Sequence, residues 1–218
     1  HTRYIGDWSS DVCSSDLCPG IRKGADEDAM VVLNRIYTRT GDDGTTALGS
    51  GERRKKYDLR VDAYGTLDEV NAALGIVRLH TSGDPLDAAL AHIQNDLFDV
   101  EADLCLSEKG PAGARLTVTD KQVDWLEKEI DKLNDMLEPL RSFVLPGGSP
   151  AAAYLHLART MCRRAERIMV RLKDQPGETV TEPSLKYVNR LSDFLFVASR
   201  YANDKGKRDV LWKPGQNR

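Results

Sequence analysis

A row of arginines at four-residue steps is the first feature of this sequence that could do chemistry. We call this row, with the adjacent Arg164, the arginine stripe: its arginines are Arg159, Arg163, Arg164, Arg167 and Arg171. Glu166 is the single acid among them. In a helix, each like-charged pair four residues apart costs about 0.2–0.5 kcal/mol, so anions should lie opposite this face. Guanidinium groups bind phosphate oxygens through two hydrogen bonds and stay charged, so the stripe predicts a polyphosphate clamp. A solvated basic face, or ion pairs with Asp68 and Asp193 on neighbouring helices, is the alternative.

A second candidate is the segment 37–46, Tyr-Thr-Arg-Thr-Gly-Asp-Asp-Gly-Thr-Thr. Its glycines allow main-chain N–H groups to converge on an anion, and its threonine hydroxyls add donors. It lacks the Gly-Lys-Ser/Thr ending and the preceding strand of a P-loop. Together with Lys56 downstream, the segment becomes a candidate second half of a nucleotide site. An ordinary turn-rich linker is the alternative.

Five amphipathic segments must position these residues. Apolar side chains recur at helical spacing in each of them; in the first, Ala63, Leu67 and Leu74 share one stripe. The predicted helices run from about Asp58 to Val77, Asp84 to Leu104, Thr119 to Leu137, Ser149 to Leu172 and Thr181 to Ala202. Mostly short turns join them, and no strand pattern competes. The sequence therefore predicts an all-α, up-and-down five-helix bundle.

Composition narrows the class of protein further. The chain has 218 residues and a net charge of −3, so no global basic field would draw it onto nucleic acid or an anionic membrane. No apolar run approaches the roughly 20 residues that a membrane span needs. We expect a cytoplasmic protein with no membrane and no nucleic-acid partner. Its expected divisions are a tail over 1–29, a Gly/Thr loop segment with the candidate nucleotide site over 30–57, the bundle over 58–204 and a C-terminal tail over 205–218.

The first of these divisions differs in character from the rest. It has clustered Ser, Asp, Gly and Cys, little aliphatic periodicity, and ends just before Met30. Residues 6–17 resemble translated sequencing-adapter DNA, which indicates a non-native segment; a natural disordered tail is the alternative. The four cysteines are Cys13, Cys18, Cys105 and Cys162. Their spacing is not that of a metal site, and we expect them to be free thiols.

Five ordered motifs together resemble the PduO-type ATP:cob(I)alamin adenosyltransferases. They are the loop 37–46, Ala-Tyr-Gly-Thr-Leu-Asp-Glu-Val-Asn (63–71), Phe-Val-Leu-Pro-Gly-Gly (143–148), Ala-Arg-Thr-Met-Cys-Arg-Arg-Ala-Glu-Arg (158–167) and Tyr-Val-Asn-Arg-Leu-Ser-Asp (187–193). The resemblance covers about Val32 to Asn203.

What the resemblance implies is a homotrimer with ATP held between adjacent subunits and a corrinoid, cobalamin or a relative, as the second substrate. Its Asp68 would pair with Arg159 of a neighbour, and Phe143 would crowd the lower face of the corrinoid. Arg163 would carry the largest catalytic share. The residues that would bind ATP are Thr38, Arg39, Thr40, Gly41, Thr46, Ala47, Lys56, Arg163, Arg164, Glu166, Arg167 and Asn189.

The implied chemistry suits the residue types present. Co(I) is itself the nucleophile, so the protein must supply positioning and cations for a departing triphosphate rather than a Ser/His/Asp group. The histidines His80, His92 and His156 are isolated, and we expect them at the surface or in the core. Magnesium is expected on the phosphates, with no protein-built metal site. A reductase and a client enzyme are candidate partners.

Two other functions remain open from the sequence. A helical nucleotide-binding enzyme performing phosphoryl transfer would release ADP and phosphate instead of intact triphosphate. A non-catalytic corrinoid carrier, or a helical interaction module, would use the arginine stripe only to bind partners.

Overall fold

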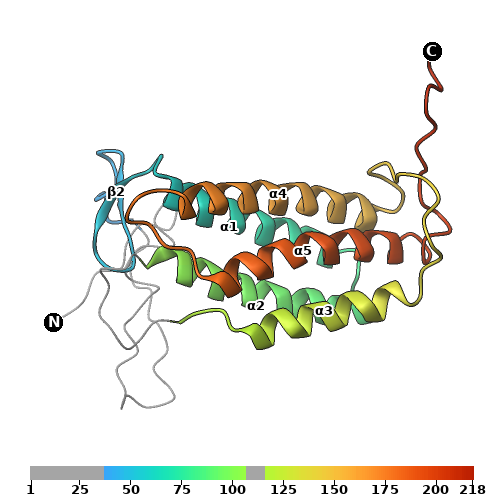
Figure 1. The fold of residues 1–218 in the computed structure, drawn as a ribbon, viewed down its shortest axis with the longest axis horizontal. Coiled ribbons are helices and arrows are strands. Elements are labelled where there is room, and N and C mark those ends of the chain that lie inside the picture. The colour runs from blue at the N-terminus through green and yellow to red at the C-terminus, as the bar shows by residue number, and fades with distance from the viewer. Residues whose placement is uncertain (1–36, 107–115) are drawn as a thin grey trace.

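The computed structural model describes residues 37–106 and 116–218, which form five helices and one small hairpin (Figure 1). The elements are β1 (Thr45–Ala47), β2 (Arg53–Lys55), α1 (Leu59–Arg78), α2 (Pro85–Cys105), α3 (Asp120–Asn134), α4 (Pro150–Lys173) and α5 (Glu182–Tyr201). The predicted all-α five-helix bundle is confirmed. The tail expected over 1–29, with Cys13 and Cys18, lies outside the described residues, as do residues 30–36.

Capping side chains set the helix starts where the sequence predicts them. The side chains of Asp58, Asp84 and Ser149 accept hydrogen bonds from backbone N–H groups in the first turns of α1, α2 and α4. Thr119 and Gln122 form a capping box at α3. These contacts satisfy N–H groups that a helix cannot pair internally, which fixes where each helix begins.

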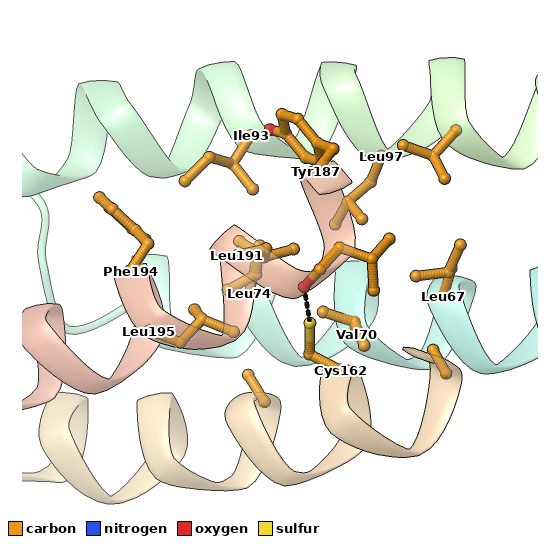
Figure 2. Packing of buried hydrophobic residues seen from close by; sticks show 14 of the residues in the cluster. Leu67, Val70, Leu74, Ile93, Leu97, Cys162, Tyr187, Leu191, Phe194 and Leu195 are labelled. Atoms are coloured by element: carbon orange, nitrogen blue, oxygen red, sulfur yellow. Dashed lines mark hydrogen bonds between the residues drawn. The ribbon is translucent and has the colours of Figure 1, made fainter. Parts of the chain in front are cut away.

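Consecutive helices run in opposite directions, and α1 packs between α2 and α4 while α5 packs between α4 and α3 (Figure 1). Leu67 and Leu74 of α1 and Leu191 of α5 belong to one core, in which these three side chains have no exposed surface, and Leu74 lies beside Leu191 (Figure 2). Each such leucine contributes roughly 1.5–3 kcal/mol by leaving water. Cys162 of α4 lies in the same core, and its Sγ donates a hydrogen bond to the carbonyl of Val188 at 3.2 Å. The described cysteines, Cys105 and Cys162, are buried thiols that form no disulfide.

A small hairpin that no pattern in the sequence predicts precedes the first helix. Residues 45–47 and 53–55 pair as an antiparallel hairpin with Thr46 opposite Arg54. Three-residue strands are too short to show the alternation of polar and apolar residues by which a strand is recognised in a sequence. A two-stranded hairpin is also marginal by itself, so its attachment to the bundle matters.

The prediction that the third helix reaches Leu137 was also wrong, because α3 ends at Asn134. The N–H groups of Met136 and Leu137 bond to the carbonyls of Leu133 and Asn134, three residues back. These tighter bonds replace the α-helical pattern in the last turn. Pro139 therefore lies beyond the end of the helix and does not terminate it.

The segment after α5 returns to the bundle. The N–H of Leu145 bonds to the carbonyl of Val210 at 2.7 Å, and the N–H of Trp212 bonds to the carbonyl of Phe143 at 2.8 Å. Ser142 Oγ donates to the carbonyl of Trp212 at 2.9 Å. The segment expected to be a C-terminal tail thus closes against the loop that precedes α4. Within the described ranges, no helix combines the length and apolar character needed to cross a membrane.

Candidate functional site

The Gly/Thr loop is held in shape by its own side chains and by the hairpin. Asp43 Oδ1 accepts hydrogen bonds from the backbone N and the hydroxyl of Thr45, at 2.9 and 2.6 Å, and the hydroxyl contact is the main reason its pKa is lowered. From β2, Arg53 donates to the carbonyl of Thr40 at 2.7 Å. The hydroxyls of Thr38 and Thr40 lie 2.9 Å apart. The loop therefore gathers small polar groups at one end of the bundle.

The remaining loop residues that the sequence singles out lie close by. Arg39 adopts a left-handed backbone with φ 64°, and its guanidinium lies 5.6 Å from the ring centre of Tyr37. Gly41 and Thr46 are buried, whereas Ala47 and Lys56 are partly exposed. The N–H of Lys56 bonds to the carbonyl of Gly44 at 3.1 Å, so the end of the hairpin is joined to its beginning.

The arginine stripe runs along α4 and is largely exposed. Arg163, Arg164 and Arg167 are exposed, and Arg167 Nη1 donates to the carbonyl of Arg163 at 3.2 Å. Glu69 of α1 forms an ion pair with Arg164. Among the described residues, neither Asp68 nor Asp193 forms an ion pair with the stripe, so the alternative partners expected from the sequence are wrong for a single protomer.

Arg159 differs from the rest of the stripe because it is half-buried. Its Nε is buried without a hydrogen-bond partner within the described part of the chain, and its guanidinium lies 6.0 Å from the ring centre of Phe196. Burial, and then the neighbouring Arg163, lower the pKa of Arg159. A desolvated cation without a counter-ion is costly, which makes this position receptive to an incoming carboxylate.

Asn189 of α5 is fixed by a chain of contacts across three helices. Its Nδ2 donates to Glu166 Oε1 at 2.7 Å, and its Oδ1 accepts from Arg190 Nη1 at 2.6 Å. Arg190 in turn donates through Nε to Glu127 Oε1 of α3 at 2.7 Å. The structure thus brings together Glu166 and Asn189, two residues that the family resemblance predicts to bind ATP.

The loop before α4 presents an apolar surface at the other end of the bundle. Phe143 is 76% exposed, and the ring of Trp212 packs against it edge-on with centroids 6.0 Å apart. Behind the rings, Asn203 accepts from the N–H of Ser149 at 2.9 Å and donates to the carbonyl of Gly147. Gly148 has φ 101°, and a Cβ there would overlap the Asn203 side chain, so only glycine fits.

The hairpin and the Phe143 loop lie at opposite ends of the bundle, and α4 extends between them (Figure 1). Residue 159 is nine positions into α4, about 14 Å from its start at 1.5 Å per residue. The stripe therefore connects an apolar surface at the start of α4 with a polar, glycine-rich loop near its end. Such an arrangement can hold an elongated anion whose non-phosphate end reaches the aromatic side chains.

His156 lies in the core, one of the two environments expected for it, whereas sequence reasoning gave no role to Glu101 or Trp212. His156 is 2% exposed and neither of its ring nitrogens has a partner among the described residues; burial, and then Arg159, lower its pKa. Glu101 of α2 is also 2% exposed, and burial followed by repulsion from Asp68 raises its pKa to about 9. Trp212 lies in a segment expected to be a tail. Only the i, i+3 spacing of His156 and Arg159 could have signalled any of these from sequence.

His80 and His92 lie at the surface of the bundle. His80 stacks on Tyr154 with ring centres 5.6 Å apart, and His92 stacks on Trp125 at 3.7 Å. Within residues 37–106 and 116–218, no three His, Cys, Asp or Glu side chains gather in a way that could hold a metal ion.

Comparison with known proteins places this geometry in a family context. The family model for cobalamin adenosyltransferase matches residues 36–202. The corrinoid adenosyltransferase of Mycobacterium leprae is 48% identical over 189 residues, which cover 84% of this chain and 97% of that protein. The cobalamin adenosyltransferase of Cupriavidus metallidurans is 43% identical over 187 residues, covering 83% and 95%.

Solved structures show the same similarity in three dimensions. A phenylalanine-to-alanine variant of the PduO-type ATP:corrinoid adenosyltransferase from Lactobacillus reuteri, complexed with cobalamin and ATP, superposes with a TM-score of 0.76 and is 35% identical. The superposition covers 82% of this chain and 99% of that one. An arginine-to-lysine variant from the same organism, complexed with ATP, gives a TM-score of 0.73 at 37% identity, covering 82% and 100%.

Proposed function

The chain belongs to the cobalamin adenosyltransferase family, and from that premise we propose that it transfers the 5′-deoxyadenosyl group of ATP to the Co(I) of cobalamin or a related corrinoid. The electron pair of Co(I) forms the bond to C5′, the C5′–O bond breaks, and its electrons leave with triphosphate, so cobalt is oxidised formally to Co(III). The observation that carries the proposal is the arginine stripe, which joins the Gly/Thr loop to the aromatic loop.

The two ends of α4 suggest how ATP lies. The triphosphate suits the cationic part of the helix around Arg163 and Arg167 and the donors of the Gly/Thr loop. The reacting C5′ then points toward the start of α4, where Phe143 and Trp212 offer an apolar surface to the corrinoid. Magnesium belongs with the substrate in this proposal, bound to triphosphate oxygens, where Mg²⁺ is generally held in nucleotide sites.

Arg163 is the residue we propose meets the negative charge that grows on the leaving triphosphate. It is exposed, and among the described residues no ion pair engages it. No ion pair within the described residues has to be broken before its guanidinium binds phosphate oxygens. An interaction that strengthens as negative charge develops stabilises the transition state more than bound ATP. Asn189, oriented by Glu166 and Arg190, would bind the nucleotide beside it.

Phe143 and Trp212 would keep water and the lower axial ligand away from cobalt. Axial ligands set the potential of a corrin or haem metal, so cobalt without them is easier to reduce. We propose that this surface, rather than a protein ligand, prepares the metal for reduction. A reductase that supplies the electron is the corresponding partner.

The half-buried Arg159 supports a site shared between subunits. Its unpartnered Nε calls for an acid, and Asp68 is exposed on α1 within the protomer. We propose that Asp68 of a neighbouring subunit pairs with Arg159 in a homotrimer, completing the ATP site at the interface. The cytoplasm is the proposed compartment, consistent with Cys105 and Cys162 being thiols outside any disulfide.

An anaerobic assay with ATP and chemically reduced corrinoid tests the proposed function. Loss of the Co(I) absorbance, with one triphosphate released per adenosylated product, is the expected result. Release of ADP and phosphate would instead indicate phosphoryl transfer, and binding of corrinoid without consumption of ATP would indicate a carrier. Arg163→Ala serves as the impaired control.

A further inference from the structure

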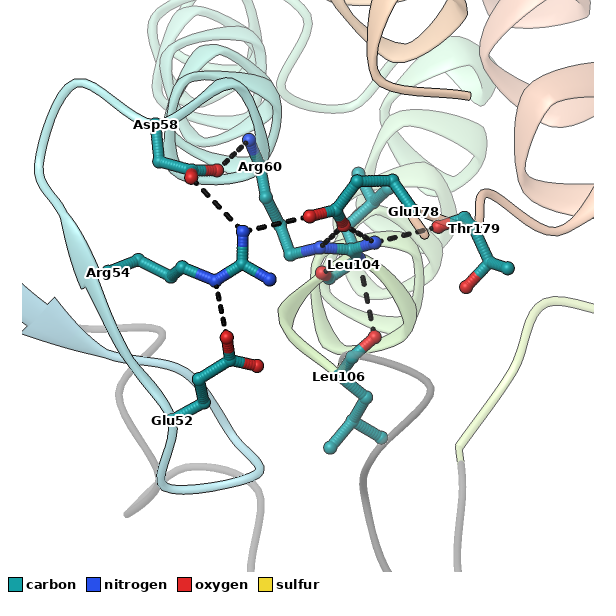
Figure 3. A network of polar contacts seen from close by, with 8 residues as sticks. All are labelled: Glu52, Arg54, Asp58, Arg60, Leu104, Leu106, Glu178 and Thr179. Carbon is teal, nitrogen blue, oxygen red and sulfur yellow. Dashed lines mark hydrogen bonds and ion pairs between the residues drawn. The ribbon is translucent and has the colours of Figure 1, made fainter. Parts of the chain in front are cut away.

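Arg60, in the first turn of α1, is a charged side chain with no exposed surface. Its Nε and Nη2 donate to Glu178 Oε2 at 2.9 and 2.6 Å, and Nη2 also donates to the carbonyl of Thr179 at 2.9 Å (Figure 3). Its Nη1 donates to the carbonyls of Leu104 and Leu106, at 2.7 and 3.2 Å. All five guanidinium N–H groups are thereby used. Arg60 ties the start of α1 to the end of α2 and to the loop after α4.

Glu178 uses its second oxygen to reach the hairpin. Its Oε1 accepts from Arg54 Nη1 of β2 at 2.8 Å. Arg54 also donates to Asp58 and Glu52, at 3.2 and 2.8 Å (Figure 3). Burial opposes the charge of Glu178, but the hydrogen bonds from Arg60 and Arg54 outweigh it and lower its pKa. One carboxylate therefore bridges a cation of the bundle and a cation of the hairpin.

The bridge fixes the element that carries half of the proposed nucleotide site. Side chains alternate along a strand, and in β2 the partly buried Arg54 lies between the exposed Arg53 and Lys55. Immediately after β2 comes Lys56, whose N–H closes the hairpin onto Gly44. The hairpin is too short to be stable alone, so its orientation depends on contacts such as this one.

We propose that Glu178 is a positioning residue for ATP binding: its carboxylate, held by Arg60, anchors Arg54 and so sets the place of the Gly/Thr loop and Lys56 against the nucleotide. The inference rests on the proposed function for the identity of the ligand. It predicts a role for residues that touch neither ATP nor corrinoid.

Arg54→Met tests the bridge with little disturbance of the core, because it keeps the aliphatic stem and leaves the Arg60–Glu178 pair intact. We expect the Kd for ATP, measured by calorimetry on the full chain, and the KM for ATP to rise about tenfold, since binding must then order the loop. The kcat at saturating ATP should stay within about twofold, as expected when only uniform binding is lost. Lys55→Met is the matched control: it removes one cation from the same strand on the other face and should leave both constants unchanged.

Glu178→Gln provides the second arm. The amide cannot serve two guanidinium groups, so ATP affinity should fall at least as far as in Arg54→Met, and the double variant should add little to the larger single effect. If Glu178→Gln fails to fold, Arg54→Met alone decides. The inference would be overturned if Arg54→Met bound ATP as tightly as the wild type, or if Lys55→Met lost as much ATP affinity as Arg54→Met. It would also be overturned if Arg54→Met lowered kcat alone. If the proposed function is wrong, the wild type will bind ATP without transferring the adenosyl group. The calorimetric comparison of ATP affinities would then still test whether the Arg54–Glu178 contact positions the loop.

Discussion

Replacing Glu101 by Gln should stabilise the protein at neutral and alkaline pH. Glu101 is buried in α2, its Oε1 has no hydrogen-bond partner within the described residues, and Asp68 is the acid that repels it. Burial, with Asp68 as a lesser cause, raises its pKa from an ordinary value of 4.5 to about 9. The folded protein therefore holds a proton on this carboxyl that the unfolded chain releases.

The sign and size of the effect follow from proton linkage. A carboxyl with a raised folded pKa contributes stability that is fully present below 4.5, the unfolded value, and is lost as the pH rises toward 9. Each pH unit in that window removes about 1.4 kcal/mol, so from pH 5 to pH 8 the wild type should lose up to about 4 kcal/mol relative to Glu101→Gln. For a chain of this size that corresponds to about 10 °C in Tm.

Urea unfolding and thermal melts of both proteins at pH 5 and pH 8 measure this difference. The pH dependence from all other groups cancels in the comparison, and Asp124→Asn, which removes an exposed carboxylate from α3, controls for net charge. Parallel stability profiles for wild type and Glu101→Gln would refute the reasoning, because they would mean that Glu101 ionises in the folded protein near its ordinary pKa.

Substitutions at three further residues test the proposed site. Arg163→Ala should lower kcat on the order of 10²–10³-fold at saturating ATP and Co(I), and Arg163→Lys should recover only part because it loses the two-pronged hydrogen bond; near-wild-type turnover would remove Arg163 from the mechanism. Asp68→Ala should leave Arg159 unpaired and weaken ATP binding on the order of tenfold or more in calorimetry, and an intact trimer with unchanged affinity would contradict the pairing. Phe143→Ala should slow adenosylation that starts from Co(II) before it weakens ATP binding, and equal rates from Co(II) would leave Phe143 with a packing role alone.

The helices could be predicted from the sequence because their signals are local. Asp84 and Pro85, or Thr119 and Gln122, lie within one turn of the helix start that they define, and the apolar period continues along each core-facing stripe. The end of α3 could not be predicted, because Leu137 continues the apolar period of the helix although its N–H bonds to the carbonyl of Asn134, three residues back. The resemblance of five motifs identified the family, which the comparisons confirm.

The contacts that shape the site depend on residues far apart in the sequence. Arg60 and Glu178 are separated by 118 positions, and nothing near either residue indicates the other. The burial of Glu101 is equally hidden, because a glutamate is almost never fully buried and its charge therefore predicts an exposed position, even directly after the core residue Val100. The roles of Arg163, Phe143 and Asn189 remain predictions, because they concern ligands and a neighbouring subunit.

The contact between Ser142 and Trp212 spans 70 positions along the chain, which has a practical consequence for anyone who makes this protein. A truncation just before Val210, or cleavage there by a protease, would leave all five helices in place yet release the loop that displays Phe143. A preparation could then be fully helical and bind ATP while being selectively defective toward the corrinoid.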